Sequence, residues 1–193
     1  MTATAEAQSL FPSPPLYRQL TWWTVAFPIV MIVALSARSF YLLNWIHVLS
    51  GALWTGADLF MGFVIGPVLK SLDVRARTAV ITYLVPRTLL YFPMVSLTTG
   101  TAGWLLASSL GFLTPGHPQF PWAIGALVLV TVMTIQGLGV MLPNSLRIWS
   151  ELRRLEPNRE RIMRLNRINI VLAGAQGVMQ IAIIVVMAHF VVG

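Results

Sequence analysis

Two ionisable side chains interrupt the apolar stretch NWIHVLSGALWTGADLF, residues 44–60. His47 carries an imidazole, a side chain that binds haem iron and transition-metal ions. Asp58 carries a carboxyl group, which is costly inside a membrane helix and usually belongs to a proton or ion pathway. The stretch therefore predicts two chemistries, which are ligation of a haem iron or metal at His47 and ion handling at Asp58.

A helix would place these two residues on one face but in different layers. Trp54 and Asp58 follow His47 at offsets that return to within about 20° of its direction on an ideal helix. Gly51 and Gly62 share this face, which we expect to turn towards neighbouring helices. Asp58 lies about 16 Å further along the helix axis than His47. The two residues are therefore expected to belong to separate sites.

The layer of His47 holds a candidate haem or metal site. We expect His47 to be an axial ligand, Trp45 and Trp54 to pack near the macrocycle, and His189 or another group to be the second ligand. A competing interpretation is that His189 lies at the lipid interface, because it falls about 180° around the helix from Gln180. His47 would then be a hydrogen-bonded packing residue.

The layer of Asp58 holds a predicted polar cluster near the bilayer midplane. Asp58, Gln136 and Gln180 lie at similar distances from the inner ends of their predicted spans. Gln176 is one helical turn from Gln180, and the long side chain of Arg87 could reach the same depth. A buried carboxylate must be paired or protonated. The cluster is therefore either a structural pair of Asp58 with Arg87 or a site for proton transfer or ion passage.

Composition places these residues in a membrane. The chain has 193 residues, of which 56% are hydrophobic and 10% charged, whereas a soluble domain has about 25% charged residues. We predict an all-α integral membrane bundle of five transmembrane helices in one domain, 20–193, after a polar tail at 1–19. Pro86 and Pro93 predict a kink in the third helix. The predicted spans are about 20–37, 41–69, 80–112, 121–146 and 168–191.

Basic residues predict the orientation and the lipid contacts. Most of the 13 lysines and arginines lie in the segments 70–78 and 147–167, which the positive-inside rule places in the cytoplasm. We therefore predict a multi-pass protein of a bacterial-type inner (cytoplasmic) membrane, with its N-terminus inside and its C-terminus outside. Anionic lipid headgroups are the expected partners of the 147–167 segment, and nucleic acid is not. Glycine faces are suited to a homo-oligomer, and a redox partner is the alternative.

The second and third predicted spans resemble a known family. His47 is followed by Trp54, Gly56 and Phe60 at the family's spacing, and RTLLYFPMVSLTTGTAGWLL, residues 87–106, resembles its next helix. The family is the membrane superfamily related to copper-resistance protein D. It includes the J-type protoporphyrinogen oxidases and the membrane domain attached to some bacterial urate oxidases. The resemblance covers roughly 40–150 and implies a four-helix core, with the first span as an addition.

This resemblance also implies cofactors. In the J-type oxidases the matching histidine binds haem, which implies haem b at His47. Those oxidases also use a lysine in a later helix, whereas the one lysine here, Lys70, lies at a helix end, so that activity does not carry over and the question of an enzyme stays open. The copper-resistance members imply copper handling, for which thioethers are suitable ligands, although methionines in apolar helices mostly pack. The methionines considered are Met61, Met94, Met133, Met141, Met179 and Met187.

Three functions are therefore open at the level of sequence. The first is a haem-binding protein with a redox or metal-handling role. The second is a small transporter or ion-handling protein that uses the polar site around Asp58. The third is an accessory subunit with no chemistry of its own.

Overall fold

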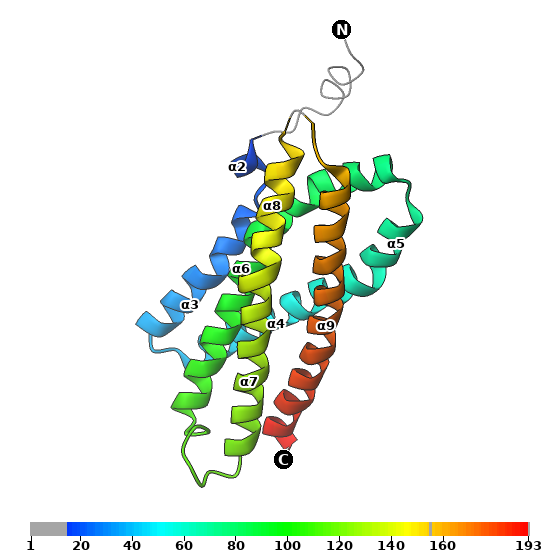
Figure 1. The fold of residues 1–193 in the computed structure, drawn as a ribbon. Coiled ribbons are helices and arrows are strands. Elements are labelled where there is room, and N and C mark those ends of the chain that lie inside the picture. Colours follow the sequence, from blue (N-terminus) through cyan, green and yellow to red (C-terminus); the bar gives the residue numbers. More distant parts are fainter. Residues whose placement is uncertain (1–14, 155, 193) are drawn as a thin grey trace.

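The computed structural model describes residues 15–154 and 156–192, and all of their regular secondary structure is helical (Figure 1). Four segments are long and apolar enough to cross a membrane, and a shorter apolar helix precedes them. The prediction of a multi-pass helical membrane protein is thus confirmed. Most of the predicted tail, 1–19, lies outside the described residues.

The elements are α2 (Leu16–Gln19), η1 (Trp22–Val25), α3 (Ala26–Ser36), α4 (Phe40–Phe60), η2 (Met61–Ile65), α5 (Gly66–Ser71), α6 (Val74–Ser109), α7 (Phe120–Gln136), η3 (Gly137–Met141), α8 (Leu142–Leu152) and α9 (Arg159–Val192).

The first apolar segment is shorter than the predicted span at 20–37. It consists of the 3-10 turn η1 and the helix α3, Trp22–Ser36, which together rise about 23 Å, less than the hydrocarbon core of about 30 Å. The helix ends before Arg38, which has a positive φ of 50°. Ser39 then caps α4 by accepting a hydrogen bond from the backbone N–H of Leu42 at 3.3 Å. Four of the five predicted spans therefore have full spanning length.

The long helices extend beyond the predicted spans at the end that carries the basic residues. The helix of the third predicted span is α6, Val74–Ser109, rather than 80–112. It begins at Val74 because Asp73 caps it by accepting hydrogen bonds from the backbone N–H groups of Arg75 and Ala76 at 2.8 and 3.0 Å. The fourth continues to Leu152, and the fifth begins at Arg159. Helix α6 contains Pro86 and Pro93 and bends in its first half (Figure 1), as proline in a helix interior predicts.

Two π-helical segments interrupt the long helices, and the sequence analysis did not predict them. One is η2 in the second predicted span and the other is η3 in the fourth. Each ends two residues before a proline, Pro67 or Pro143. A wider turn relieves the clash of the proline ring with the preceding turn of helix. Such segments inside α-helices are frequent at functional sites.

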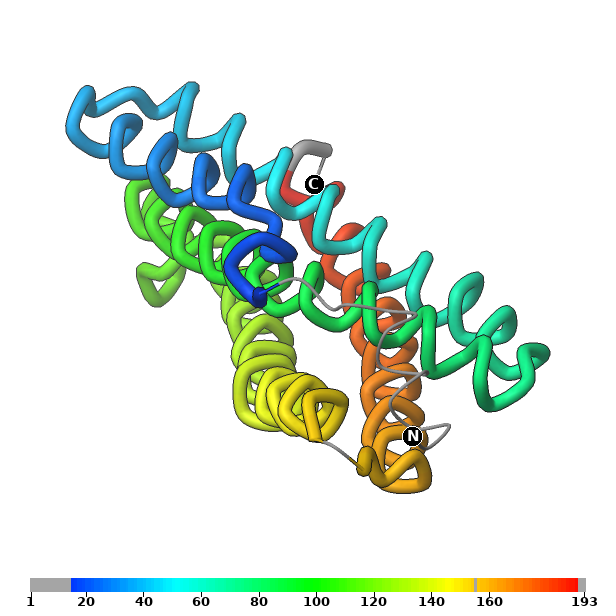
Figure 2. Tube along the Cα trace, turned by 90° about the horizontal axis from the view of Figure 1, so that it is seen from above, coloured from blue at the N-terminus to red at the C-terminus, as the bar shows by residue number. Residues whose placement is uncertain are grey.

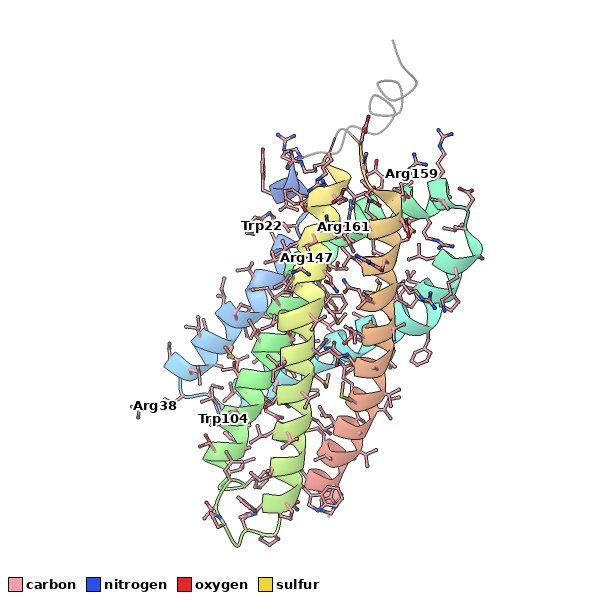
Figure 3. All side chains as sticks on the ribbon, in the orientation of Figure 1. Trp22, Arg38, Trp104, Arg147, Arg159 and Arg161 are labelled. Carbon is pink, nitrogen blue, oxygen red and sulfur yellow. The ribbon has the colours of Figure 1, made fainter. Side chains whose placement is uncertain are left out.

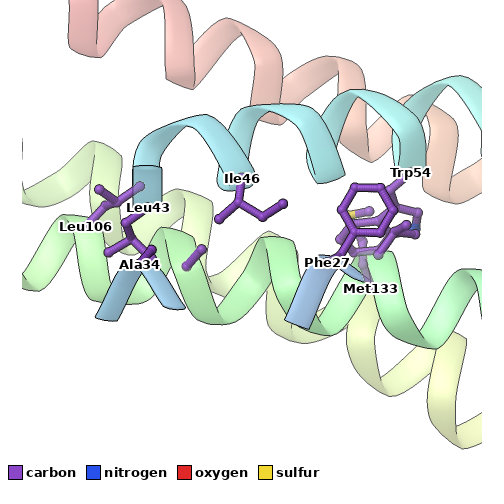
Figure 4. Packing of buried hydrophobic residues seen from close by; sticks show 9 residues of the cluster. Phe27, Ala34, Leu43, Ile46, Trp54, Leu106 and Met133 are labelled. Carbon is purple, nitrogen blue, oxygen red and sulfur yellow. The ribbon is translucent and has the colours of Figure 1, made fainter. Parts of the chain in front are cut away.

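The helices form two groups that meet at α4 and α9. Seen from above, α3, α4 and α6 lie side by side, and α7, α8 and α9 lie against them (Figure 2). The largest buried apolar cluster joins α3, α4, α6 and α7, and Phe27, Trp54 and Met133 pack together in it (Figure 4). The outward surface carries exposed aliphatic side chains such as Ile135, which is 65% exposed, as a lipid-facing surface requires.

The two ends of the bundle differ in charge. Figure 3 shows Arg147, Arg159 and Arg161 at one end, which we call the basic end, and Arg38 towards the other, which we call the opposite end. Glu151 is 2% exposed at the basic end and forms ion pairs at 3.3 Å with Arg154 and Arg161. It therefore joins the end of α8 to the start of α9.

Candidate functional site: a buried carboxyl beside a central cavity

Asp58 is completely buried at the contact between α4 and α9. Its exposed fraction is 0%, and that of Gln180 is 3%. The Gln180 Nε2 group donates a hydrogen bond to Asp58 Oδ2 at 2.8 Å. The sequence analysis placed both residues in one midplane cluster, and the structure brings these two into direct contact.

Glycines allow the two helices to come this close. A Cβ atom added at Gly62 would lie 2.8 Å from the Cα of Gly174, and one added at Gly177 would lie 2.8 Å from a methyl group of Leu59. Small residues at a crossing are the usual way in which membrane helices approach each other. These close approaches, both within about one turn of the Asp58–Gln180 contact, bring α9 near enough for the short Asp58 side chain to reach Gln180.

One oxygen of each partner is left without a hydrogen bond. Asp58 Oδ1 and Gln180 Oε1 are both buried and have no partner among the described residues. The Trp54 side chain, one turn away on α4, also donates weakly towards the carboxyl, and the Tyr91 side chain on α6 lies near it. The Tyr91 hydroxyl donates to the backbone carbonyl of Leu53 at 2.9 Å. Buried acceptors are nearly always satisfied in proteins, so the two free oxygens mark this contact as a candidate site.

The other members of the predicted midplane cluster have different partners. Gln176 donates to the Met133 carbonyl at 2.8 Å, and Gln136 donates to the Leu172 carbonyl at 3.4 Å. Both therefore join helices through backbone groups rather than through Asp58.

Arg87 is exposed on α6 rather than buried beside Asp58. Its guanidinium donates to the Tyr83 carbonyl of its own helix at 2.6 Å and lies 6.0 Å from the centre of the Tyr83 ring. Within residues 15–154 and 156–192, the ion pairs are those of Glu151. The structural pair of Asp58 with Arg87 is therefore not formed, and Gln180 occupies the place of the expected counter-charge.

A central cavity of about 80 Å³ lies beside this contact. It runs between α6 on one side and η3, α8 and α9 on the other, and both π-helical segments contribute to its wall. Trp54 and Met61 line it from either side of Asp58 along the α4–η2 helix. None of its described lining residues is ionisable. Its polar lining residues are Thr88, Ser96, Thr134, Ser145, Asn166, Asn169 and Gln176.

His47 is held against α6. Its Nδ1 lies 3.0 Å from the Thr99 carbonyl oxygen, so Nδ1 carries the hydrogen and donates it. A Cβ atom added at Gly103 would be 2.7 Å from the imidazole ring, so the ring fills the space that this glycine leaves open. The Thr99 hydroxyl also donates within this contact, to Ser50 Oγ at 2.8 Å. This is the arrangement of a satisfied packing histidine, with Nε2 left as a potential ligand.

His189 contacts a different helix. Its ring stacks on Trp122 of α7 at 4.1 Å between ring centres, next to the neighbouring pair of Phe112 with Phe190. Neither His189 nor His47 lines the central cavity. The described residues contain no group of three or more His, Cys, Asp or Glu side chains that could hold a metal ion. Of the described residues, His47 could supply one imidazole to a haem, whereas the His189 ring is stacked on Trp122 of another helix.

Copper ligation would draw on methionine sulfur instead. Three of the six methionines considered, Met61, Met133 and Met141, line the central cavity. Met133 is fully buried in the main apolar cluster, where a methionine commonly serves packing. Haem and copper binding both stay predictions that an absorption spectrum and metal analysis would test.

No protein-family model, curated protein or solved structure matches this chain. The resemblance to the copper-resistance D superfamily therefore stays a prediction, and the function is argued from geometry. Sequence reasoning missed the cavity and the Thr99 and Gly103 contacts of His47. The small residues Ser50, Thr99 and Gly103 are a signal for close packing that could have located the second of these.

Proposed function

We propose that the protein moves ions across the membrane and that Asp58 is the ionisable group on their path. The observation that carries this proposal is the buried Asp58–Gln180 contact with one free acceptor oxygen on each side chain. A free carboxylate oxygen can take up a proton or bind a cation, and a neighbouring amide oxygen can share it. Such a group at the centre of a membrane protein is by default functional.

The choice of a carboxyl group at position 58 supports the same conclusion. A charged aspartate at the centre of a membrane helix costs about 2.5–3.5 kcal/mol, and the donors Gln180 and Trp54 offset only part of this. Asparagine would accept the same hydrogen bond without the charge. A side chain that serves only to join α4 to α9 has no need of an ionisable group.

The orientation belongs to this proposal. The basic end carries the arginines of α8 and α9, and the positive-inside rule then puts that end in the cytoplasm. Asp58 would thus be approached from the cytoplasm along the segments that contain Lys70, Arg147 and Arg161.

The test is ion flux through purified protein reconstituted into liposomes, read with an entrapped pH-sensitive dye under an imposed pH gradient or membrane potential. Asp58→Asn keeps an acceptor for Gln180 and removes the charge, so it should reduce flux to the leak of empty liposomes. Asp73→Asn is the matched control, because Asp73 is an exposed acid at a helix start and asparagine is an equally good cap. It should retain the wild-type rate.

Flux in Asp58→Asn equal to that of the wild type would refute the proposal, provided both proteins elute as one species and show the same helix content. Absence of wild-type flux under gradients of protons, sodium and potassium would refute it as well. Asp58→Glu, which restores a carboxyl group, should recover part of the rate if the ionisable group matters and none if only the packing does.

A further inference from the structure

The central cavity has room for water and a lining that water can bind. A buried water needs about 10–15 Å³ of accessible space, so a cavity of about 80 Å³ holds several. The hydroxyls of Thr88, Ser96 and Thr134 donate to carbonyl groups of their own helices, at 2.9, 3.4 and 2.8 Å. Their oxygens therefore keep lone pairs that can accept hydrogen bonds, and all three residues line the cavity.

Asn169 and the Leu89 carbonyl contribute further oxygen atoms to the lining. Asn169 uses its amide nitrogen to donate to the Met141 carbonyl and to Ser145 Oγ, at 3.2 and 2.9 Å. Pro93 has no N–H, so the Leu89 carbonyl on the preceding turn lacks its usual helical donor, and both residues line the cavity. The polar groups of this mostly apolar lining thus include acceptors and also the Ser145 hydroxyl, which accepts from Asn169 and can donate. Water donates and accepts hydrogen bonds and carries protons, so it suits these groups.

The surroundings disfavour metal cations. Asn169 accepts a hydrogen bond from Asn144 at 3.2 Å, and Asn144 accepts one from the exposed Arg147 at 3.4 Å. Arg147 thus brings a positive charge near the cavity wall, and this charge acts on every cation that approaches, hydronium included. A hard metal ion needs about six oxygen ligands, whereas Asp58 and Gln180 have one free oxygen each. A proton needs only one.

We propose that the central cavity is a water-filled path by which protons reach the Asp58–Gln180 contact from the basic end of the bundle. The inference rests on the proposed function and names its ion and its route. A hydronium ion gives its proton to Asp58 Oδ1, which becomes a neutral carboxylic acid, and leaves as water. Neither Asp58 nor Gln180 lines the cavity, so the last part of the route passes Trp54 and Met61, the lining residues about one turn away on either side of Asp58 in the sequence.

The absence of cysteine from the chain allows a direct test of the water. Ser96→Cys places a thiol in the cavity wall, and Leu97→Cys places one at the same depth on the outer surface, where Leu97 is 44% exposed. Methanethiosulfonates react with the thiolate, which does not form in hydrocarbon. Methyl methanethiosulfonate, which is small and neutral, should modify Ser96→Cys at least about tenfold faster than Leu97→Cys.

A second pair of cysteine variants, nearer the basic end, tests from which side of the membrane water enters the cavity and whether Arg147 slows the entry of cationic reagents. Ser145→Cys lies in the cavity wall, and Leu146→Cys lies outside. Impermeant sulfonatoethyl methanethiosulfonate should modify Ser145→Cys only from the side that labels Ser71→Cys, which lies at the basic end. The cationic trimethylammonioethyl reagent should react more slowly because of Arg147.

The outcomes separate this inference from the proposed function. Equal reactivity of Ser96→Cys and Leu97→Cys, or labelling of Ser145→Cys from the opposite side, would overturn the water path even if Asp58→Asn abolishes flux. A flux that requires sodium or potassium and fails in choline salts would overturn the proton assignment while leaving Asp58 as an ion site. Fast labelling of Ser96→Cys without any wild-type flux would refute the proposed function, and the proton assignment with it.

Discussion

Replacing Gly62 by alanine tests whether the α4–α9 crossing creates the Asp58 site. The added methyl group would lie 2.8 Å from the Cα and 3.0 Å from the backbone nitrogen of Gly174. These atoms belong to a helix backbone and cannot rotate away, so the two helices must separate. We expect Gly62→Ala to weaken both the fold and the Gln180–Asp58 hydrogen bond, which is 2.8 Å long.

The size of the effect follows from a comparison with Gly56→Ala. A Cβ atom at Gly56 has nothing within 4 Å, so this variant gains only the helix propensity of alanine, about 0.5–1 kcal/mol. Gly62→Ala has a similar gain but also the cost of overpacking, about 1–3 kcal/mol. The difference between the two variants isolates the contact, and we expect Gly62→Ala to be less stable than Gly56→Ala by about 1–3 kcal/mol.

The measurement is the free energy of unfolding by sodium dodecyl sulfate in mixed micelles, followed by the fluorescence of the seven tryptophans. Gly174→Ala is a second control from the other side of the crossing, because a Cβ atom there also meets nothing within 4 Å. Proton flux in liposomes should fall in Gly62→Ala and stay near the wild-type rate in Gly56→Ala and Gly174→Ala.

Equal stabilities of Gly62→Ala and Gly56→Ala would show that the close approach of α4 to α9 is not present in the protein. Normal flux in a destabilised Gly62→Ala would show instead that the crossing supports the fold but that the Asp58–Gln180 distance is unimportant for ion movement.

Two further predictions concern residues outside this contact. The backbone N–H groups of Ala76 and Arg75 hold the pKa of the Asp73 carboxyl below its ordinary value of 3.8, so its capping contribution is present above that pH and is lost as pH falls through the folded-state pKa. In thermal melting from pH 6 to 3, the difference in melting temperature between wild type and Asp73→Ala should disappear below about pH 4. A difference that is independent of pH would contradict this. His47→Ala leaves the Thr99 carbonyl without its donor and opens space beside Gly103, so it should destabilise the protein by about 1–3 kcal/mol. If the predicted haem binds, the Soret band of the purified wild type should vanish in the same variant. A colourless wild type expressed with ample haem would refute haem binding.

Much of the fold could be predicted because hydropathy is a local property. The four long spans were located by their apolar runs, whereas the starts of α4 and α6 at the capping residues Ser39 and Asp73 were not predicted. The bend of α6 follows from Pro86 and Pro93. The short length of the first helix could not be predicted from hydropathy, because its ends are set by the 3-10 turn and by Arg38.

Helical periodicity also placed Asp58 and Gln180 at one depth on inward faces, and it separated Asp58 from His47. It did not choose the partner of Asp58. Arg87 was a candidate counter-charge because its side chain is long, but the Arg87 guanidinium donates a hydrogen bond to the Tyr83 carbonyl of its own helix. Which of several inward polar residues meet depends on how helices cross, and a pattern along one helix does not contain the crossing angle.

The sequence by itself determined that this chain is a helical membrane protein with a single carboxyl group well inside an apolar span, because both properties follow from the composition and spacing of single segments. Only the tertiary structure decided that Gln180 is the group that meets this carboxyl and that a cavity lies beside the contact. The physical reason is that both depend on how the helices cross, as at the close approach of Gly62 to Gly174, and such contacts arise only when distant segments pack together.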